Sequence, residues 1–389
     1  MIANHIREKM QSGSWIRDMF EKGAELKKIY GDDMVFDLTL GNPDVPAPDE
    51  VNRAIIARAS MGNNIHGYMS NAGYPEIRSL IADMEAKRSG VPVTMENVTM
   101  CVGAAGGLNC VFKAILNPGD EVLVQAPYFV QYGGYVDNHG GKLKVVPAKL
   151  PDFDLDPQLI GSYITPKTKA VIINSPNNPT GVVYSRETLE ALEQVLTAKE
   201  KEFGTDIYLV SDEPYREIVY DGVEVPPVMS IFHNAIVVYS YSKSLSLAGE
   251  RIGYVAVSPN CSDVEALSAA IPYATRELGY TNAPGLFQYI LKDCINCQTD
   301  VDAYKVRRDI LMQGLQELGY EFPVPQGAFY IFMKTPTEDE NEFINNYCLP
   351  RNVLAVPGRG FGCPGYMRVA YCVSEKTIRG AIEALRECK

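Results

Sequence analysis

The chain contains the stretch Ala170-Val-Ile-Ile-Asn-Ser-Pro-Asn-Asn-Pro-Thr-Gly181, in which a short apolar run passes directly into amides, prolines and a glycine. The run lacks the alternation of a half-exposed strand, which is typical of a strand buried on both faces of a sheet. Similar runs occur at Glu121–Gln125, Ile207–Asp212, Ala235–Ser240 and Tyr254–Ser258, with amphipathic helical stretches between them. Strands that alternate with helices predict an α/β fold with a mostly parallel sheet.

One of these helices has clear signals at both ends. Ser185 is a plausible N-cap, and leucines at 189, 192 and 196 follow it at helical spacing. Gly204 then offers the flexible residue that commonly ends a helix. The sequence therefore predicts a helix from Ser185 to Gly204.

The last hundred residues have a different pattern. A helical stretch at Val301–Leu318 precedes strand-like runs, and a final helix begins near Ser374. This order predicts a smaller α+β unit at the end of the chain. We expect a small C-terminal domain at 291–389, a large ligand-binding domain at 46–290, and an N-terminal segment at 1–45 that joins the small domain.

Composition excludes several classes of protein. The 389 residues are 46% hydrophobic and 22% charged, which is typical of a globular chain with a sizeable core. The net charge of −12 argues against nucleic acid as a partner, because phosphate neutralisation needs a basic face. No apolar stretch approaches the length of a membrane span, and the N-terminus has no apolar signal segment. We therefore expect a cytoplasmic protein with no membrane partner.

The nine cysteines are an odd number, and they are scattered along the chain. Cys294 and Cys297 form the one C-x-x-C pair, and no second pair stands at the spacing of a zinc site. We therefore expect reduced thiols and no metal.

Polar groups follow three of the predicted strands at the point where each strand ends. They are Ser175-Pro-Asn-Asn-Pro-Thr-Gly181, Asp212-Glu-Pro-Tyr215 and Ser240-Tyr-Ser-Lys243. Ligands of open α/β sheets bind outside the carboxyl ends of the strands. The sequence therefore predicts one site that holds an amide, a carboxylate, a phenol and a lysine.

The stretch Val102-Gly-Ala-Ala-Gly-Gly107 adds a phosphate-binding feature to this site. It opens a predicted helix with small residues, and bare amides at a helix N-terminus bind phosphate. A lysine near Arg251 and such a terminus has a lowered pKa, which suits Schiff-base chemistry at Lys243. Taken singly, a tight turn and a solvated lysine would explain these features. Together with the acid at Asp212, they describe a pyridoxal phosphate site.

With these motifs in place, the sequence resembles the fold-type I aminotransferases of class I/II, which include aspartate aminotransferase. The resemblance runs from Gly41-Asn-Pro43 to Arg368, and its strongest parts are Asn177–Gly181, Ser211–Tyr215 and Ser240–Lys243 followed by Gly249–Tyr254. It implies a large domain with a mostly parallel seven-stranded sheet flanked by helices, plus a smaller α+β domain. It also implies pyridoxal 5'-phosphate as cofactor and a homodimer.

The resemblance gives a role to each residue that matches a family motif. Residues matched to the cofactor are Lys243 as the Schiff-base lysine, Asp212 at the ring nitrogen, Asn178 and Tyr215 at the ring hydroxyl, Phe129 stacked on the ring, and Ala104, Ala105, Ser240, Ser242 and Arg251 at the phosphate. Lys243, Asp212 and Tyr215 would be the catalytic residues. Many relatives carry a hydroxyl or charged side chain in place of Ala104 and Ala105, so the phosphate here would rely more on backbone amides.

Other matched residues concern the substrate and a second subunit. Arg368 resembles the arginine that binds the substrate α-carboxylate, and Gly41 the small residue beside it. Tyr68 resembles the tyrosine that reaches the phosphate of the neighbouring subunit. Arg276 lies one position away from a distal-carboxylate arginine of some aspartate aminotransferases, and we expect it instead on the surface.

The expected reaction is ping-pong transfer of an amino group from an L-amino acid to a 2-oxo acid. The donor could be aspartate or a neutral or aromatic amino acid. A carbon–sulfur β-lyase on the same fold is the alternative, and it would release ammonia without a second oxo acid. A regulator fused to a DNA-binding domain would need a basic segment ahead of the fold, where we count only about 35 residues.

Overall fold

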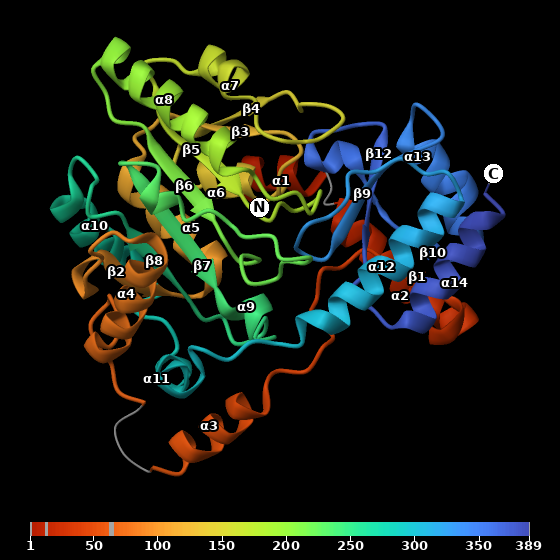
Figure 1. Cartoon of the computed structure of the whole chain (residues 1–389), viewed down its shortest axis with the longest axis horizontal. Coiled ribbons are helices and arrows are strands. Elements are labelled where there is room, and N and C mark those ends of the chain that lie inside the picture. The colour runs from red at the N-terminus through yellow and green to blue at the C-terminus, as the bar shows by residue number, and fades with distance from the viewer. Residues whose placement is uncertain (1, 12–14, 62–65, 389) are drawn as a thin grey trace.

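The computed structural model describes residues 2–11, 15–61 and 66–388. Its largest sheet has seven strands in the order β2-β8-β7-β6-β5-β3-β4 (Figure 1). Their bounds are β2 (Val98–Cys101), β3 (Glu121–Gln125), β4 (Lys142–Val146), β5 (Thr168–Asn174), β6 (Tyr208–Asp212), β7 (Ala235–Ser240) and β8 (Gly253–Val257). Within this sheet β8 runs antiparallel to both of its neighbours and every other pair is parallel. The predicted mostly parallel seven-stranded sheet is confirmed.

Helices cover both faces of this sheet and bury its apolar side chains. One face packs against α5 (Gly103–Ile115), α6 (Tyr132–Asp137) and α10 (Val264–Glu277). The helices on the other face are α3 (Asp49–Ala59), α4 (Pro75–Ser89), α7 (Pro157–Tyr163), α8 (Arg186–Phe203) and α11 (Gly285–Cys294). The strands between these layers are buried on both sides, as their continuous Val and Ile content predicts.

Helix α8 has the bounds that the local sequence predicts. The Ser185 hydroxyl accepts a hydrogen bond of 3.0 Å from the amide of Thr188, and Gly204 ends the helix with φ +64°. A left-handed conformation favours glycine at that position. Here the end signals alone were sufficient.

A second group of elements is built mainly from the C-terminal part of the chain. Its strands are β9 (Tyr330–Lys334), β11 (Val356–Pro357) and β12 (Tyr366–Ala370) in one sheet, with β1 (Phe36–Asp37) paired to β10 (Val353–Leu354). Its helices are α2 (Trp15–Tyr30), α12 (Val301–Glu317), α13 (Glu340–Phe343) and α14 (Glu375–Arg386). Leu38 and Val45 share a hydrophobic cluster with residues from 304 to 388. The N-terminal segment therefore packs with the C-terminal elements.

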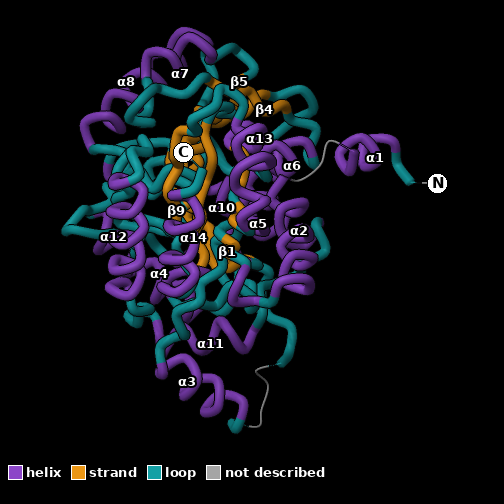
Figure 2. The backbone as a smooth tube through the Cα atoms, turned by 90° about the vertical axis from the view of Figure 1, so that its right-hand side faces the viewer, coloured by secondary structure: helices purple, strands orange, loops and turns teal. Residues whose placement is uncertain are grey.

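Helix α1 (Asn4–Gln11) lies at one side of the molecule (Figure 2), where Lys9 pairs with Asp137 at the end of α6. At the bottom of the molecule in Figure 1, α3 packs along α11. Across the part of the chain that the structure describes, no helix is long and apolar enough to cross a membrane.

Candidate active site

A cavity of about 300 Å³ lies at the carboxyl edge of the seven-stranded sheet. Asn174, Asp212 and Ser240, the last residues of β5, β6 and β7, all line it. The predicted site residues that line this cavity are Gly41, Ala104, Ala105, Phe129, Asn178, Asp212, Tyr215, Ser240, Ser242, Lys243, Arg251 and Arg368. The fold therefore brings together residues that are more than 300 positions apart in the sequence.

Asp212 is a fully buried carboxyl with one unsatisfied oxygen. The Tyr132 hydroxyl donates a hydrogen bond of 2.6 Å to its Oδ2, whereas Oδ1 has no partner among the described residues. Burial raises the pKa of Asp212 to about 7, even though the Tyr132 hydrogen bond opposes the shift. The free oxygen needs a donor, and a positively charged donor would restore the ionised form.

Lys243 projects into the same cavity from the short helix α9 (Tyr241–Ser244). Its Nζ donates a hydrogen bond of 2.5 Å to the carbonyl oxygen of Gly41. Burial lowers the pKa of Lys243 to about 8, and Arg368 and Arg251 add to this lowering. A sizeable fraction of the amine is therefore neutral and nucleophilic near physiological pH.

One end of the cavity is an anion cradle built from the start of α5. No side chain caps this helix, so its first-turn amides are available to a ligand. Gly103 has φ +74°, and a Cβ there would lie 2.6 Å from Nη2 of Arg251. Arg251 is held by the carbonyl of Ala248 at 2.9 Å, while the hydroxyls of Ser240 and Ser242 lie 2.7 Å apart beside it.

Arg368 occupies another part of the cavity and is 2% exposed. Its Nη1 donates to Oδ1 of Asn178 at 3.0 Å, its Nη2 donates to the carbonyl of Thr39, and its Nε has no partner within the described ranges. The guanidinium lies 4.4 Å from the ring centroid of Tyr330 and 4.9 Å from that of Phe361. A rigid, desolvated guanidinium of this kind suits bidentate binding of a carboxylate.

Sequence reasoning missed three residues of this site. Asn174 donates to the carbonyl of Asp212 at 2.8 Å and accepts from the amide of Asn178 at 2.7 Å, so it fixes two predicted residues at once. Tyr132 holds Asp212, and Tyr330 lines the cavity beside Arg368. Only Asn174 had a sequence signal, because it is the last residue of a predicted strand. The tyrosines lie in a helix and a strand whose patterns indicate burial alone.

Two residues lie away from this cavity. Tyr68 is 93% exposed and does not line it. Arg276, near the end of α10, is also exposed and outside the lining, as expected for a surface arginine. Neither side chain reaches the site of its own chain.

The donor set of the cavity fits pyridoxal phosphate. The unsatisfied oxygen of buried Asp212 suits a protonated ring nitrogen, and the α5 amides with Arg251 suit the phosphate. The amine of Lys243, whose pKa is lowered to about 8, suits formation of a Schiff base with an aldehyde.

The model of the family "Aminotransferase class I and II" matches residues 33–385. Over 374 residues the chain is 37% identical to a probable aspartate/prephenate aminotransferase of Thermus aquaticus, with 93% of each chain covered. A crystal structure of an aminotransferase from Eubacterium rectale has a TM-score of 0.96 and 42% identity, covering 100% of this chain and 98% of its own. The aspartate aminotransferase of Thermus thermophilus with maleate has a TM-score of 0.87 and 32% identity, with both chains fully covered. The chain therefore belongs to the class I and II aminotransferases, enzymes that depend on pyridoxal phosphate.

Proposed function

We propose that this aminotransferase carries out its reaction in the cavity at the carboxyl edge of the seven-stranded sheet, with Lys243 and Asp212 as its central residues. The proposal rests on one observation: the buried amine of Lys243 and the buried carboxyl of Asp212 line the same cavity, and their pKa values are shifted in opposite directions. The pKa of the amine is lowered to about 8 and that of the carboxyl is raised to about 7. Perturbed groups that share a cleft mark functional sites.

Pyridoxal phosphate supplies an electrophilic aldehyde and a ring that accepts electrons when a proton leaves the substrate. Lys243 Nζ would bind the aldehyde carbon in the resting enzyme, and the amine, once displaced, would carry the proton from the substrate Cα to the cofactor carbon C4′. Asp212 Oδ1 accepts the ring N–H and keeps that nitrogen cationic, while Tyr132 orients the carboxylate. Asn178 and Tyr215 hold the ring hydroxyl.

The remaining residues position the cofactor and the substrate. Phe129 stacks on the ring. The phosphate is bound by the α5 amides at Ala104 and Ala105 and by the side chains of Ser240, Ser242 and Arg251. Arg368 binds the α-carboxylate of every donor, beside the backbone of Gly41, whose carbonyl receives Lys243 in the structure.

The donor that the cavity itself favours is an amino acid with an uncharged side chain. Three cations line it within the described residues, namely Lys243, Arg251 and Arg368. Each has a role above, so none remains for a second carboxylate. Leu40 and Leu108 add apolar surface to the lining, which suits neutral or aromatic side chains.

Aspartate is a second candidate donor, because several relatives are named aspartate or aspartate/prephenate aminotransferases. The structure of the Thermus thermophilus enzyme with maleate points the same way, since maleate carries two carboxylates. For an acidic donor, the extra cation would be Arg276 of the partner subunit. The enzyme would then be a homodimer in which Tyr68 reaches across to the neighbouring phosphate, in keeping with its 93% exposure.

A panel of amino donors against 2-oxoglutarate tests the donor class. We expect Arg368→Leu to lower kcat/KM for all donors alike, by about 30-fold or more, since a charge-assisted contact is lost. Arg276→Leu should leave neutral and aromatic donors unchanged. A selective loss with aspartate in Arg276→Leu would establish the acidic donor and a shared site. Release of ammonia without an oxo acid would instead favour a β-lyase.

We also propose a division into a large domain and a small domain joined by 1–45; the expected boundary at 290/291 moves beyond α11, because Leu291 and Cys294 pack in the core of the large sheet. The pairing of β1 with β10 and the shared hydrophobic cluster support it. A cytoplasmic location is proposed as well, because all nine cysteines are free thiols, which suits a reducing compartment.

A further inference from the structure

The hydroxyl of Tyr215 is a group of the proposed cofactor site whose proton has two possible directions. It lies 2.9 Å from the hydroxyl of Tyr330, and either oxygen could be the donor. If Tyr215 donated to Tyr330, its proton would point away from the cavity and could not serve a ligand. The direction of this single hydrogen bond therefore decides whether Tyr215 can donate to the ring hydroxyl.

Tyr330 has no alternative partner for its proton. Among the described residues its hydroxyl makes one hydrogen bond, the one to Tyr215. The side chain is 2% exposed on β9, so within the described residues its proton has no acceptor other than the Tyr215 hydroxyl. A buried hydroxyl that leaves its proton unpaired loses stability, which favours Tyr330 as the donor.

The guanidinium of Arg368 strengthens this preference. It lies 4.4 Å from the ring centroid of Tyr330, and a cation at that distance makes a phenol a better donor. Burial raises the pKa of Tyr330, and Arg368 opposes that rise. Burial raises the pKa of Tyr215 well above its ordinary value, and the neighbouring Tyr330 raises it further. The cation that lies over the ring of Tyr330 therefore favours Tyr330 as the donor.

The backbone around Tyr330 holds its hydroxyl in place. A Cβ at Gly41 would lie 1.7 Å from the Tyr330 hydroxyl oxygen and 2.6 Å from its ring carbon Cζ, so only a glycine admits this tyrosine. The rings of Tyr215 and Tyr330 meet edge to face at 5.9 Å and 81°. Strand β9 also pairs with β12, which carries Arg368. The hydroxyl therefore has little freedom to turn elsewhere.

We propose that Tyr330 is a positioning residue of this enzyme: its hydroxyl donates to that of Tyr215 and so directs the Tyr215 proton into the cavity, toward the ring hydroxyl of the cofactor. The inference rests on the proposed function, because it assumes that Tyr215 faces the cofactor ring. It makes the role of Tyr215 depend on a residue of the C-terminal elements. It also explains why residue 41 is a glycine independently of substrate binding, since a side chain there would displace Tyr330.

The test is a pH titration of the absorbance of the cofactor-bound enzyme. Tyr215→Phe removes a donor to the ring oxygen, destabilises its anionic form and should raise the pKa of the titration. Tyr330→Phe removes one oxygen, leaves a weaker donor at Tyr215 and should raise that pKa by about half a unit to one unit. In the double variant, Tyr330→Phe should add little, because its effect passes through Tyr215.

Tyr220→Phe is the matched control. Tyr220 is a buried tyrosine nearby whose hydroxyl donates to the carbonyl of Ala328 at 2.7 Å and does not line the cavity. It should leave the cofactor titration unchanged, and thermal unfolding of all apoproteins reports any general loss of fold.

Two results would overturn the inference while leaving the proposed function intact. One is an unchanged cofactor titration in Tyr330→Phe, and the other is an equal shift with and without Tyr215. Failure of the wild type to bind pyridoxal phosphate at Lys243, seen as no borohydride-fixed label on that residue, would instead overturn the proposed function and this inference with it.

Discussion

Asp212 and Glu85 are both fully buried carboxyls, yet their surroundings shift their pKa values in opposite directions. Burial raises the pKa of Asp212 to about 7, because no cation lies beside it. Burial also acts to raise the pKa of Glu85, but Arg216 and Arg88 hold it below its ordinary value. The first carboxyl faces the cavity at the sheet edge and the second lies in an ion cluster on the opposite face.

The ion cluster consists of Glu85, Arg88, Glu213, Arg216 and Tyr254. Nη1 of Arg216 lies 2.7 Å from Oε1 of Glu85 and 3.2 Å from Oε2 of Glu213, and Nη1 of Arg88 lies 3.1 Å from that same Oε2. Nη2 of Arg216 donates to the Tyr254 hydroxyl at 2.7 Å, and that hydroxyl donates to Glu85 at 2.5 Å. Each acid therefore has a cation within the protein.

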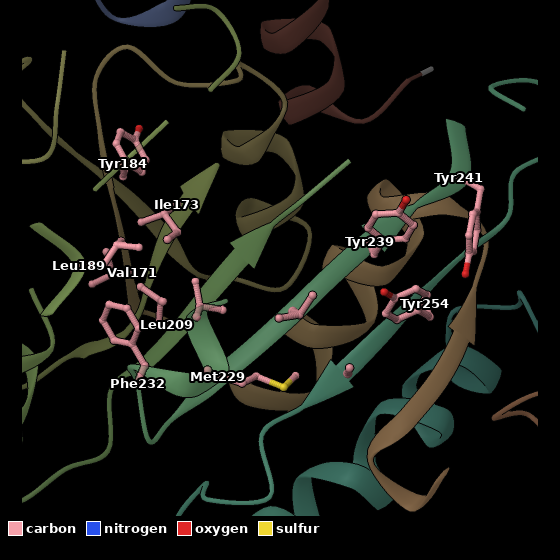
Figure 3. Close-up of a cluster of buried hydrophobic side chains, with 14 of the residues drawn as sticks. Val171, Ile173, Tyr184, Leu189, Leu209, Met229, Phe232, Tyr239, Tyr241 and Tyr254 are labelled. Atoms are coloured by element: carbon pink, nitrogen blue, oxygen red, sulfur yellow. The ribbon is translucent and has the colours of Figure 1, made fainter. Parts of the chain in front are cut away.

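Neighbouring residues at the end of β6 lie in these two environments: Asp212 is the last residue of the strand and Glu213 follows it. Asp212 and Glu213 are consecutive, and consecutive side chains near a strand point to opposite faces of the sheet. Figure 3 shows Tyr239, Tyr241 and Tyr254 gathered on the face that holds the cluster, and the Arg216 guanidinium lies 4.2 Å from the ring centroid of Tyr239. Burial therefore does not decide what a carboxyl does. The presence or absence of a built-in countercharge does.

The largest expected contrast comes from Lys243→Ala. We expect transamination to fall by more than about 10³-fold, since the group that moves the Cα proton is gone, with thermal stability retained. Wild type should be yellow and should carry a borohydride-fixed label on Lys243. Lys334→Ala, which removes an exposed lysine outside the cavity, is the control and should be fully active. Full turnover by Lys243→Ala would refute the assignment.

Arg216→Met removes the central cation of the ion cluster and leaves the cavity unchanged. It leaves Glu85 and Glu213 buried with too little positive charge, so the free energy of unfolding should drop by about 3–5 kcal/mol. Urea denaturation measures this change. Arg386→Met removes an exposed ion pair with Glu383 and should cost no more than about 0.5 kcal/mol. Equal stabilities of the two variants would show that the cluster is not a stabilising unit.

Asp212→Ala tests the carboxyl that lies in the cavity and has no countercharge. It should still bind the cofactor but lose about 10²–10³-fold in kcat, because the ring nitrogen is no longer held cationic. Its apoprotein should lose less stability than Arg216→Met, because no ion pair is broken and only the Tyr132 hydroxyl loses its acceptor. Steady-state kinetics with thermal unfolding measure both. A near-normal kcat would assign the ring nitrogen to another group.

The last prediction concerns the pH dependence of the stability of the apoprotein. The pKa of Asp212 is raised to about 7 in the folded chain, against an ordinary value near 3.9 in the unfolded one. Between those values the folded state holds the extra proton, so this group lowers stability as pH rises, by at most about 1.4 kcal/mol per pH unit. Asp212→Asn should flatten that part of the unfolding profile. Identical profiles from pH 4 to 7 would contradict the raised pKa.

Local signals in the sequence were strong enough to predict the central elements. The predicted strands at Glu121–Gln125 and Ala235–Ser240 have the bounds of β3 and β7, and α8 lies between its predicted caps. Strands β2 and β4 carry no such signal. Both lie at edges of the sheet, and β4 mixes lysines with its apolar residues, as edge strands do.

The chemistry of the site was also predictable in part. Lys243, Asp212 and Asn178 follow strand ends, and the carboxyl ends of parallel strands meet at one edge. Tyr132 and Tyr330 were not predictable, because their contacts with Asp212 and Tyr215 join segments 80 and 115 residues apart.

By itself, the sequence determined which segments become strands and helices and which polar groups stand at the strand ends, since these depend on neighbours along the chain. It thereby determined the family and the predicted cofactor. Only the tertiary structure decided which carboxyl has a countercharge and which does not, and which tyrosine meets Tyr215. The physical reason is that charge balance and hydrogen bonding depend on distances across the fold, and a residue's position in the sequence does not contain them.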